Sequence, residues 1–218
     1  MHAASDLSTA AYCPRQLYYR RREDDRETPP SVGKRRALAF EYPDLIDASD
    51  ASLSDRPIEL PPDEYRENLR RARDRLDPWD ALADPADREV LLTGRECRGI
   101  AGKVLEKPFA PSYVSPGAPP EQGVWEPHSV RAVALAKALS WERERAVETA
   151  FVEYPAYGVV RRIGLTTRRK AAYRGAIRSV ETIDGPPSRL KNSAKCDSCE
   201  YRDRCGTRTR SLRSLLGL

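Results

Sequence analysis

Histidine and methionine are scarce in this chain, and long apolar runs are absent. Two histidines, His2 and His128, and one methionine occur among 218 residues, so a metal site built mainly from imidazoles is excluded. No stretch approaches the roughly 18 consecutive apolar residues of a membrane-spanning helix. The first residues also lack the basic stretch and apolar segment of a secretory signal. We therefore expect a cytoplasmic protein without a membrane partner.

The composition is that of a folded protein with one main core. Hydrophobic residues make up 39% of the chain and charged residues 33%, which is typical of globular proteins and not of disordered ones. The length allows one domain with a small appendage. We expect a single domain over residues 1–218 with three parts, which are a helical part over 1–86, an α/β core over 87–185 and a cysteine-bearing part over 186–218.

Basic residues gather in the last part of the chain. Residues 155–218 hold 15 Lys and Arg against 5 Asp and Glu, a local net charge of +10, whereas the whole chain carries +5. Arginine supplies 31 of the 38 basic residues, and its guanidinium binds phosphates bidentately and stacks on bases. These features favour a DNA partner, although codon bias and solvated helix faces explain the same composition. The candidate phosphate contacts are Arg161, Arg162, Arg168, Arg169, Lys170 and Arg174.

Helices are predicted in the first part of the chain. Residues 5–22 have the pattern of a helix that Pro14 interrupts. A second helix is expected within 31–47, a loop within 42–62, and a helix over 62–76 whose mostly charged faces make it peripheral.

The middle of the chain alternates strands and helices. Strands are expected over 88–94, 96–107 and 111–115, then a helix over 126–145, two strands over 147–157 and 158–167, and a helix over 166–183. This order predicts an α/β fold in which a sheet is flanked by helices.

Three of the five cysteines lie close together near the end of the chain. The segment KCDSCEYRDRC, residues 195–205, has the spacing C-x2-C-x5-C. In a cytoplasmic protein this clustering favours a metal site over disulfides, and three thiolates need a fourth ligand. Cys97 lies in an expected strand, where a free cysteine usually packs as a small apolar residue, whereas Cys13 lies beside Pro14 at a helix break. Four cysteines can hold zinc or an iron–sulfur cluster, and the spacing alone does not choose.

Two segments of the chain resemble one nuclease family. YCPRQLYYRR at 12–21 and KCDSCEYRDRC at 195–205 resemble the two halves of the cluster site in CRISPR-associated iron–sulfur exonucleases, which belong to the RecB-like PD-(D/E)xK superfamily. Between them, GIAGKV resembles a motif strand of the family, EPHSVRAVALAKAL its motif helix, and AFVEYPAY with the residues up to SVETI its late hairpin and helix. The resemblance covers most of the chain and is weakest over about 40–86.

The resemblance implies a restriction-endonuclease-like core sheet flanked by helices, with an N-terminal helical arm and a C-terminal cysteine knuckle. It also implies a [4Fe–4S] cluster whose ligands are Cys13, Cys196, Cys199 and Cys205. Such a cluster would tie the two ends of the chain together and act mainly as a structural staple. DNA is the implied ligand, and a CRISPR integrase or another DNA-processing protein is a candidate partner.

The residues that make this superfamily a metal-dependent nuclease are missing. Family members hold Mg²⁺ or Mn²⁺ with an Asp, a Glu-x-Lys pair and a helix His. The Asp position aligns with Leu105, and the Glu and Lys positions align with Tyr113 and Ser115. No histidine occurs between residues 3 and 127. We therefore expect no catalytic residue at these positions.

The motif helix and the remaining carboxylates also depart from the family pattern. The Gln and Tyr positions of the helix align with Arg131 and Leu135, and we expect the nearby His128 to be a capping or surface residue. No carboxylate in the sheet region forms an acid-x-Lys pair on a strand, and the ones considered are Glu96, Glu106 and Glu121.

Three functions remain open at this point. The preferred hypothesis is an iron–sulfur-cluster member of the family that binds DNA or scaffolds other proteins without cutting DNA. The first alternative is an active exonuclease that depends on Mg²⁺ or Mn²⁺ and trims CRISPR spacer precursors. The second alternative is a structural protein stapled by zinc.

Overall fold

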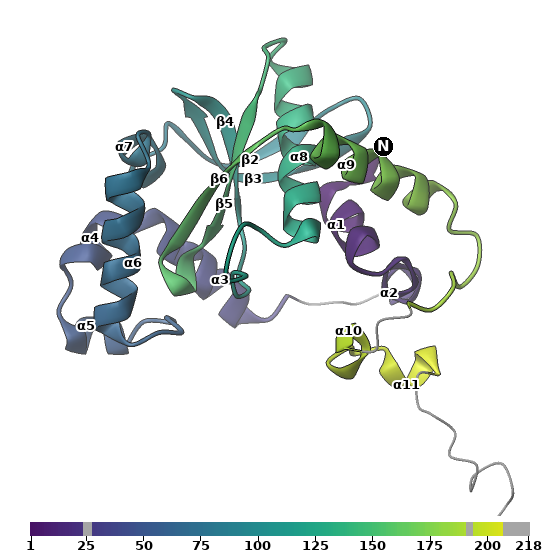
Figure 1. Cartoon of the computed structure of the whole chain (residues 1–218), viewed down its shortest axis with the longest axis horizontal. Helices are drawn as coiled ribbons and strands as arrows, with labels where there is room; N and C mark the ends of the chain where they lie inside the picture. The colour runs from purple at the N-terminus through teal and green to yellow at the C-terminus, as the bar shows by residue number, and fades with distance from the viewer. Residues whose placement is uncertain (24–27, 191–193, 207–218) are drawn as a thin grey trace, which may run out of the picture.

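The centre of the molecule is a mixed six-stranded sheet with helices on both faces (Figure 1). A computed structural model describes residues 1–23, 28–190 and 194–206. The α/β fold that the alternating pattern predicts is confirmed. The strands are β1 (His2–Ala3), β2 (Asp87–Thr93), β3 (Cys97–Glu106), β4 (Phe109–Val114), β5 (Thr149–Tyr154) and β6 (Val159–Gly164).

Connection lengths explain the order of the strands. β2, β3 and β4 form an antiparallel meander, because the links at 94–96 and 107–108 are long enough only for hairpins. β5 then pairs parallel with β4, since helix α8 (Glu126–Glu142) crosses over between the two strands. β6 returns antiparallel to β5, and β1 adds a short parallel pair to β3.

One face of the sheet packs against α1 (Ala4–Tyr12), α8 and α9 (Thr167–Glu181). α8 touches the sheet and both other helices, so it is apolar around most of its circumference. The predicted stripe of this helix is buried in full, and its members are Val130, Val133, Ala134, Leu135, Ala138 and Leu139. Each larger apolar side chain of this kind contributes about 1.5–3 kcal/mol when it leaves water.

The other face is covered by helices from the first part of the chain. They are α3 (Pro30–Ala37), the 3₁₀ turn η1 (Leu38–Phe40), α4 (Tyr42–Asp47), α5 (Asp50–Ser54), α6 (Pro62–Arg75) and α7 (Trp79–Ala83). Their buried side chains form a second apolar cluster with residues of the sheet. The sheet therefore separates two cores, and each of its buried strands contributes side chains to both.

Several predictions for this helical part are wrong. The helix expected over 31–47 is divided into α3, η1 and α4, and the expected loop over 42–62 contains α4 and α5. The helix over 62–76 has the predicted length but is not peripheral, because Tyr65 is fully buried and its hydroxyl donates to the Pro155 carbonyl at 3.0 Å. A charged helix can still bury a narrow stripe, and three of its fourteen residues are enough here.

The first predicted helix is interrupted at the expected place. α1 ends at Tyr12, and α2 (Pro14–Arg20) starts with Pro14 at its first position, where a missing N–H costs nothing. Cys13 lies between the two helices in an extended conformation, with φ −161°. The last described elements are the short helices α10 (Ala194–Asp197) and α11 (Arg202–Cys205). In the part of the chain that the structure describes, no helix is long and apolar enough to cross a membrane.

A buried ion pair joins the sheet to the covering helices. The ammonium of Lys103 on β3 lies 2.8 Å from the Glu153 carboxylate on β5, and both side chains are 0% exposed. The same ammonium donates to the carbonyls of Ala39 at 2.6 Å and Leu82 at 2.7 Å. Ser112 on β4 donates to the other Glu153 oxygen. Burial lowers the pKa of Lys103, and the Glu153 carboxylate opposes that shift.

We predict that Lys103→Met destabilises the protein by about 3–5 kcal/mol, because it leaves the Glu153 charge buried without its partner. The free energy of unfolding in urea measures this. Lys103→Met/Glu153→Met should recover part of the loss. The control is Arg71→Met, which breaks the exposed pair with Glu67 and should cost about 0.5 kcal/mol. Equal losses in Lys103→Met and Arg71→Met would contradict the prediction.

Candidate functional site

The four cysteines predicted to bind a cluster line one cavity. Cys13 comes from the break between α1 and α2, Cys196 from α10, Cys199 from the turn that follows, and Cys205 from α11. All four are partly buried, and none of them is in a disulfide. Residues separated by more than 180 positions therefore meet, as the resemblance implies. Part of the predicted cysteine-bearing segment, residues 191–193 and 207–218, lies outside the described residues.

Tyrosines hold the C-terminal segment against the first two helices, and Figure 1 shows α10 and α11 beside α2. The ring of Tyr201 stacks on Tyr19, with centroids 5.7 Å apart and planes 17° apart. The Tyr19 hydroxyl donates to the Arg204 carbonyl at 3.1 Å, and the Tyr12 hydroxyl donates to the Lys195 carbonyl at 3.3 Å. These contacts bring the second cysteine-bearing segment to Cys13.

Charged groups complete this docking. The carboxylate of Glu23 accepts from the Tyr201 hydroxyl at 2.6 Å and from the Arg204 guanidinium at 3.1 Å. The Arg15 guanidinium donates to the Pro187 carbonyl at 2.8 Å and also hydrogen-bonds the Cys205 side chain. A cation beside a thiol favours the thiolate, which is the form that binds metals.

The four thiols influence one another. Burial raises the pKa of the Cys199 thiol, a hydrogen bond from the Tyr201 backbone lowers it, and the neighbouring Cys13, Cys196 and Cys205 raise it further. Four thiolates this close repel each other unless a cation compensates their charge. A cationic guest is therefore the natural complement of this cavity.

Four cysteine thiolates are chemically suited to two kinds of guest. Among the described residues, no group of three or more His, Cys, Asp and Glu side chains is placed to hold a metal ion. A single zinc ion requires four sulfurs at about 2.3 Å from one point. A four-iron cluster is a larger guest, so its thiolates stand farther apart. The lining of the cavity therefore does not choose between the two guests.

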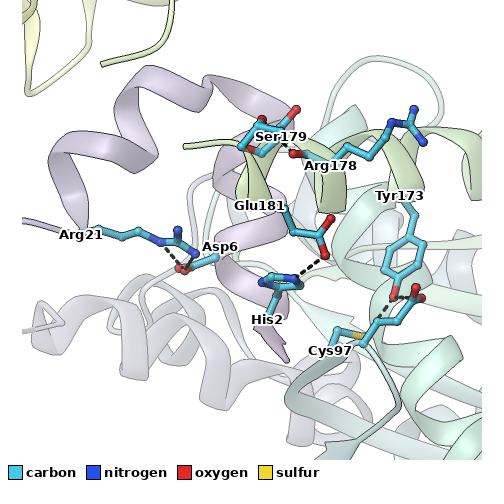
Figure 2. A network of polar contacts seen from close by, with 10 residues as sticks. His2, Asp6, Arg21, Cys97, Tyr173, Arg178, Ser179 and Glu181 are labelled. Atoms are coloured by element: carbon cyan, nitrogen blue, oxygen red, sulfur yellow. Dashed lines mark hydrogen bonds and ion pairs between the residues drawn. The ribbon is translucent and has the colours of Figure 1, made fainter. Parts of the chain in front are cut away.

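Cys97 takes no part in this cavity. It is 1% exposed on β3, and its thiol donates to the Ala134 carbonyl at 3.3 Å. The Tyr173 hydroxyl of α9 points to it at 3.4 Å (Figure 2). Burial raises the pKa of the Cys97 thiol. The expectation that this residue packs as a small apolar side chain is confirmed.

The positions aligned with the nuclease motif do not form a site. Leu105 lies in the cluster under the covering helices, whereas Tyr113 lies in the cluster on the α8 face. The two side chains are therefore separated by the sheet, and an Asp and a Glu placed there would not share a metal. Ser115 is buried, and its hydroxyl accepts from the Gly117 N–H at 3.3 Å. None of these three residues carries a carboxylate, so the oxygen ligands that Mg²⁺ or Mn²⁺ requires are missing at these positions.

The remaining carboxylates of this region are scattered. Glu106 is exposed at the end of β3 and pairs with Arg145 at 3.1 Å. Glu96 accepts from the Tyr173 hydroxyl at 3.3 Å. Glu121 lies exposed in the loop before α8. The three lie in different places, at the end of β3, beside α9 and in the loop before α8, so together they do not rebuild the missing motif.

His128 is neither a helix cap nor a surface residue, so that prediction is wrong. The imidazole is half-buried on the first turn of α8, with its Nδ1 3.0 Å from the Tyr154 hydroxyl. The Tyr113 ring packs against it edge-on at 5.6 Å. Burial and, secondarily, the charge of Arg131 lower the pKa of His128 to about 4. The sequence signals only a lone histidine, and the covering aromatic rings come from distant strands.

The six predicted DNA contacts lie on β6 and the first half of α9. Arg162, Arg168 and Arg174 are exposed. Arg169 and Lys170 are half-buried, and the Arg169 guanidinium donates to the Gly164 carbonyl at 3.1 Å.

Arg161 differs from the other five, because its guanidinium donates to the carbonyls of Pro120, Glu121 and Gly123. These bonds tie down the loop before α8. Arg161 therefore has the least freedom to reach a phosphate.

We predict that protonation of His128 destabilises the fold in mild acid. The neutral form is favoured in the native state, so its contribution is complete above the unfolded pKa of about 6.5 and is lost as the pH falls toward 4. Between pH 7 and pH 4.5, the wild type should lose on the order of 2 kcal/mol more than His128→Gln. Urea unfolding at a series of pH values measures the difference. Parallel stability curves for the two proteins would refute this.

Comparison with known proteins adds no relative. No protein-family model and no curated protein sequence matches the chain.

Proposed function

We propose that the protein is an iron–sulfur-cluster member of the CRISPR-associated exonuclease family that binds DNA, or scaffolds a DNA-processing complex, without cutting DNA. The observation that carries this proposal is the common cavity of Cys13, Cys196, Cys199 and Cys205. The mixed sheet with helices on both faces is compatible with a nuclease-superfamily core, and it follows the order of elements that the resemblance uses.

In this proposal the four cysteines would hold a [4Fe–4S] cluster. When bound, the cluster supplies four covalent ties between the N-terminal helices and the C-terminal segment. The tyrosine contacts Tyr19–Tyr201 and Tyr12–Lys195 orient the two segments, and Arg15 lowers the cost of gathering negative thiolates. A zinc-stapled structural protein is the second candidate, because four cysteine thiolates also bind a single zinc ion.

Cleavage of DNA is not part of the proposed function. In such nucleases, carboxylates hold the metal that activates water and neutralises the phosphate. Leu105 offers no ligand, Tyr113 carries no carboxylate, and Ser115 cannot replace the cation of a Lys. The separation of Leu105 and Tyr113 by the sheet removes the geometry as well.

DNA binding is proposed through the exposed basic residues of β6 and α9. The accessible members are Arg162, Arg168 and Arg174, with Arg169 and Lys170 beside them. Contacts of this kind are made to phosphates, so they carry no sequence preference. The protein partner would be another DNA-processing protein, for which a CRISPR integrase is the candidate that the resemblance implies.

We predict that protein purified without oxygen is brown and contains about four irons per chain. Cys13→Ser should lose the colour and most of the iron, as should the same change at Cys196, Cys199 or Cys205. Cys97→Ser is the matched control, because that thiol is buried outside the cavity, and it should keep both. Metal analysis by mass spectrometry and the visible spectrum measure the outcome. One zinc per chain with no iron would favour the structural alternative, and a colourless Cys97→Ser beside a coloured Cys13→Ser would refute the ligand set.

We predict no cleavage of single- or double-stranded DNA above background with Mg²⁺ or Mn²⁺. The physical reason is the absence of carboxylates where a metal ion would have to bind. Labelled substrates on a denaturing gel give the measurement. Glu96→Ala, Glu106→Ala and Glu121→Ala identify contamination, since a contaminating nuclease is unaffected by them. Metal-dependent cleavage that one of these substitutions abolishes would mean that the active site is rebuilt, and the exonuclease alternative would then hold.

A further inference from the structure

A groove over β3 is lined by three arginines from three different elements. Arg36 comes from α3, Arg98 from β3 and Arg131 from α8. Among the residues that line the groove, Glu89 is the only carboxylate. The groove lies between the start of α1, the covering helices and the sheet, away from the cysteine cavity. Its net positive charge favours an anionic ligand.

Two of these guanidiniums carry buried donors without acceptors. The Nε–H groups of Arg36 and Arg131 are buried and have no hydrogen-bond partner among the described residues. The neighbouring Arg35, by contrast, pairs with Glu59. A buried donor without an acceptor costs free energy, so native structures almost always satisfy such groups. Arg15 and Arg56, which lie outside the groove, carry the same kind of buried Nε–H. The case for an anionic ligand therefore rests on the three gathered positive charges.

The side chain of Arg131 is held in one orientation by its neighbours. Its guanidinium lies over the Tyr113 ring, 4.5 Å from the centroid, and the same ring makes an edge-on contact with His128. Stacking of this kind holds the planar fork in place, so less side-chain entropy is lost on binding.

The wall of the groove is apolar and exposed. Leu91 and Ile100 face each other across β2 and β3, and they are 59% and 54% exposed. Val114 packs closely on Gly102 in the floor, where an added Cβ would lie 2.5 Å from a methyl of Val114. A ligand that fits this surface combines an oxyanion with an apolar face.

We infer that this groove is a phosphate-binding site in which Arg36, Arg98 and Arg131 bind the phosphate of an oligonucleotide or free phosphate. Guanidinium forks match the oxygens of a phosphate, and several of them neutralise its charge. Leu91 and Ile100 offer the apolar surface on which a nucleotide base can lie. The site uses none of the cysteines and none of the β6 and α9 arginines. The inference is therefore independent of the proposed cluster and of the proposed DNA contacts on β6 and α9.

Fluorescence anisotropy with a labelled oligodeoxythymidine tests this on the full chain, with and without a 5′-phosphate, and with inorganic phosphate as the competitor. Arg36→Gln, Arg98→Gln and Arg131→Gln should each weaken oligonucleotide affinity about tenfold. Arg70→Gln is the matched control, because Arg70 is exposed on α6 outside the groove, and it should bind as the wild type. Arg98 is exposed, so its variant folds even where a change at the half-buried Arg36 or Arg131 disturbs the structure.

The probes separate the two sources of the phosphate. Binding that requires the 5′-phosphate assigns a terminal phosphate, binding without it assigns a phosphodiester, and competition by inorganic phosphate alone assigns the free anion. Any of these three modes of binding supports the site if Arg98→Gln abolishes it. The site is refuted if Arg98→Gln binds both probes as the wild type does, or if polyglutamate displaces the oligonucleotide while phosphate does not. The iron content of every variant should stay unchanged, as a control for folding. If only Arg168→Ala/Arg169→Ala/Lys170→Ala loses oligonucleotide binding, the binding site lies on α9 and the inference is overturned.

Discussion

The buried contact between Lys103 and Glu153 determines how the helical part sits on the sheet. One ammonium reaches the Ala39 and Leu82 carbonyls, which belong to the covering helices, and a carboxylate two strands away. A charge without such partners would not be tolerated at 0% exposure. Because η1 follows α3 directly, this contact also fixes the wall of the groove that carries Arg36.

A second constraint acts between the ends of the chain. The tyrosine stack and the Glu23 contacts bring the C-terminal cysteines to Cys13. Each of these contacts is worth little by itself, because most are exposed or partly exposed. Closing so long a loop costs several kcal/mol of chain entropy, which is why a covalent guest would add so much to this docking.

The two candidate binding sites follow opposite electrostatic rules. The cysteine cavity gathers groups that become negative and therefore favours a cationic guest, while the groove gathers guanidiniums and favours an anion. The positions that would hold Mg²⁺ in a nuclease are neutral and face different cores. The two sites therefore differ in the sign of the ligand charge that each one favours.

The sequence by itself determined the succession of strands and helices over 87–181, the break at Pro14 and the grouping of three cysteines, because alternation, ring chemistry and spacing are local properties. The helices over 42–54 were not predicted, because short segments rich in Asp, Ser and Pro show little hydrophobic periodicity. Only the tertiary structure decided that Lys103 is buried, that Leu105 and Tyr113 face apart, and that Arg36, Arg98 and Arg131 share a groove. Those outcomes depend on which elements pack together, and no local pattern encodes the distance between side chains that lie far apart in the chain.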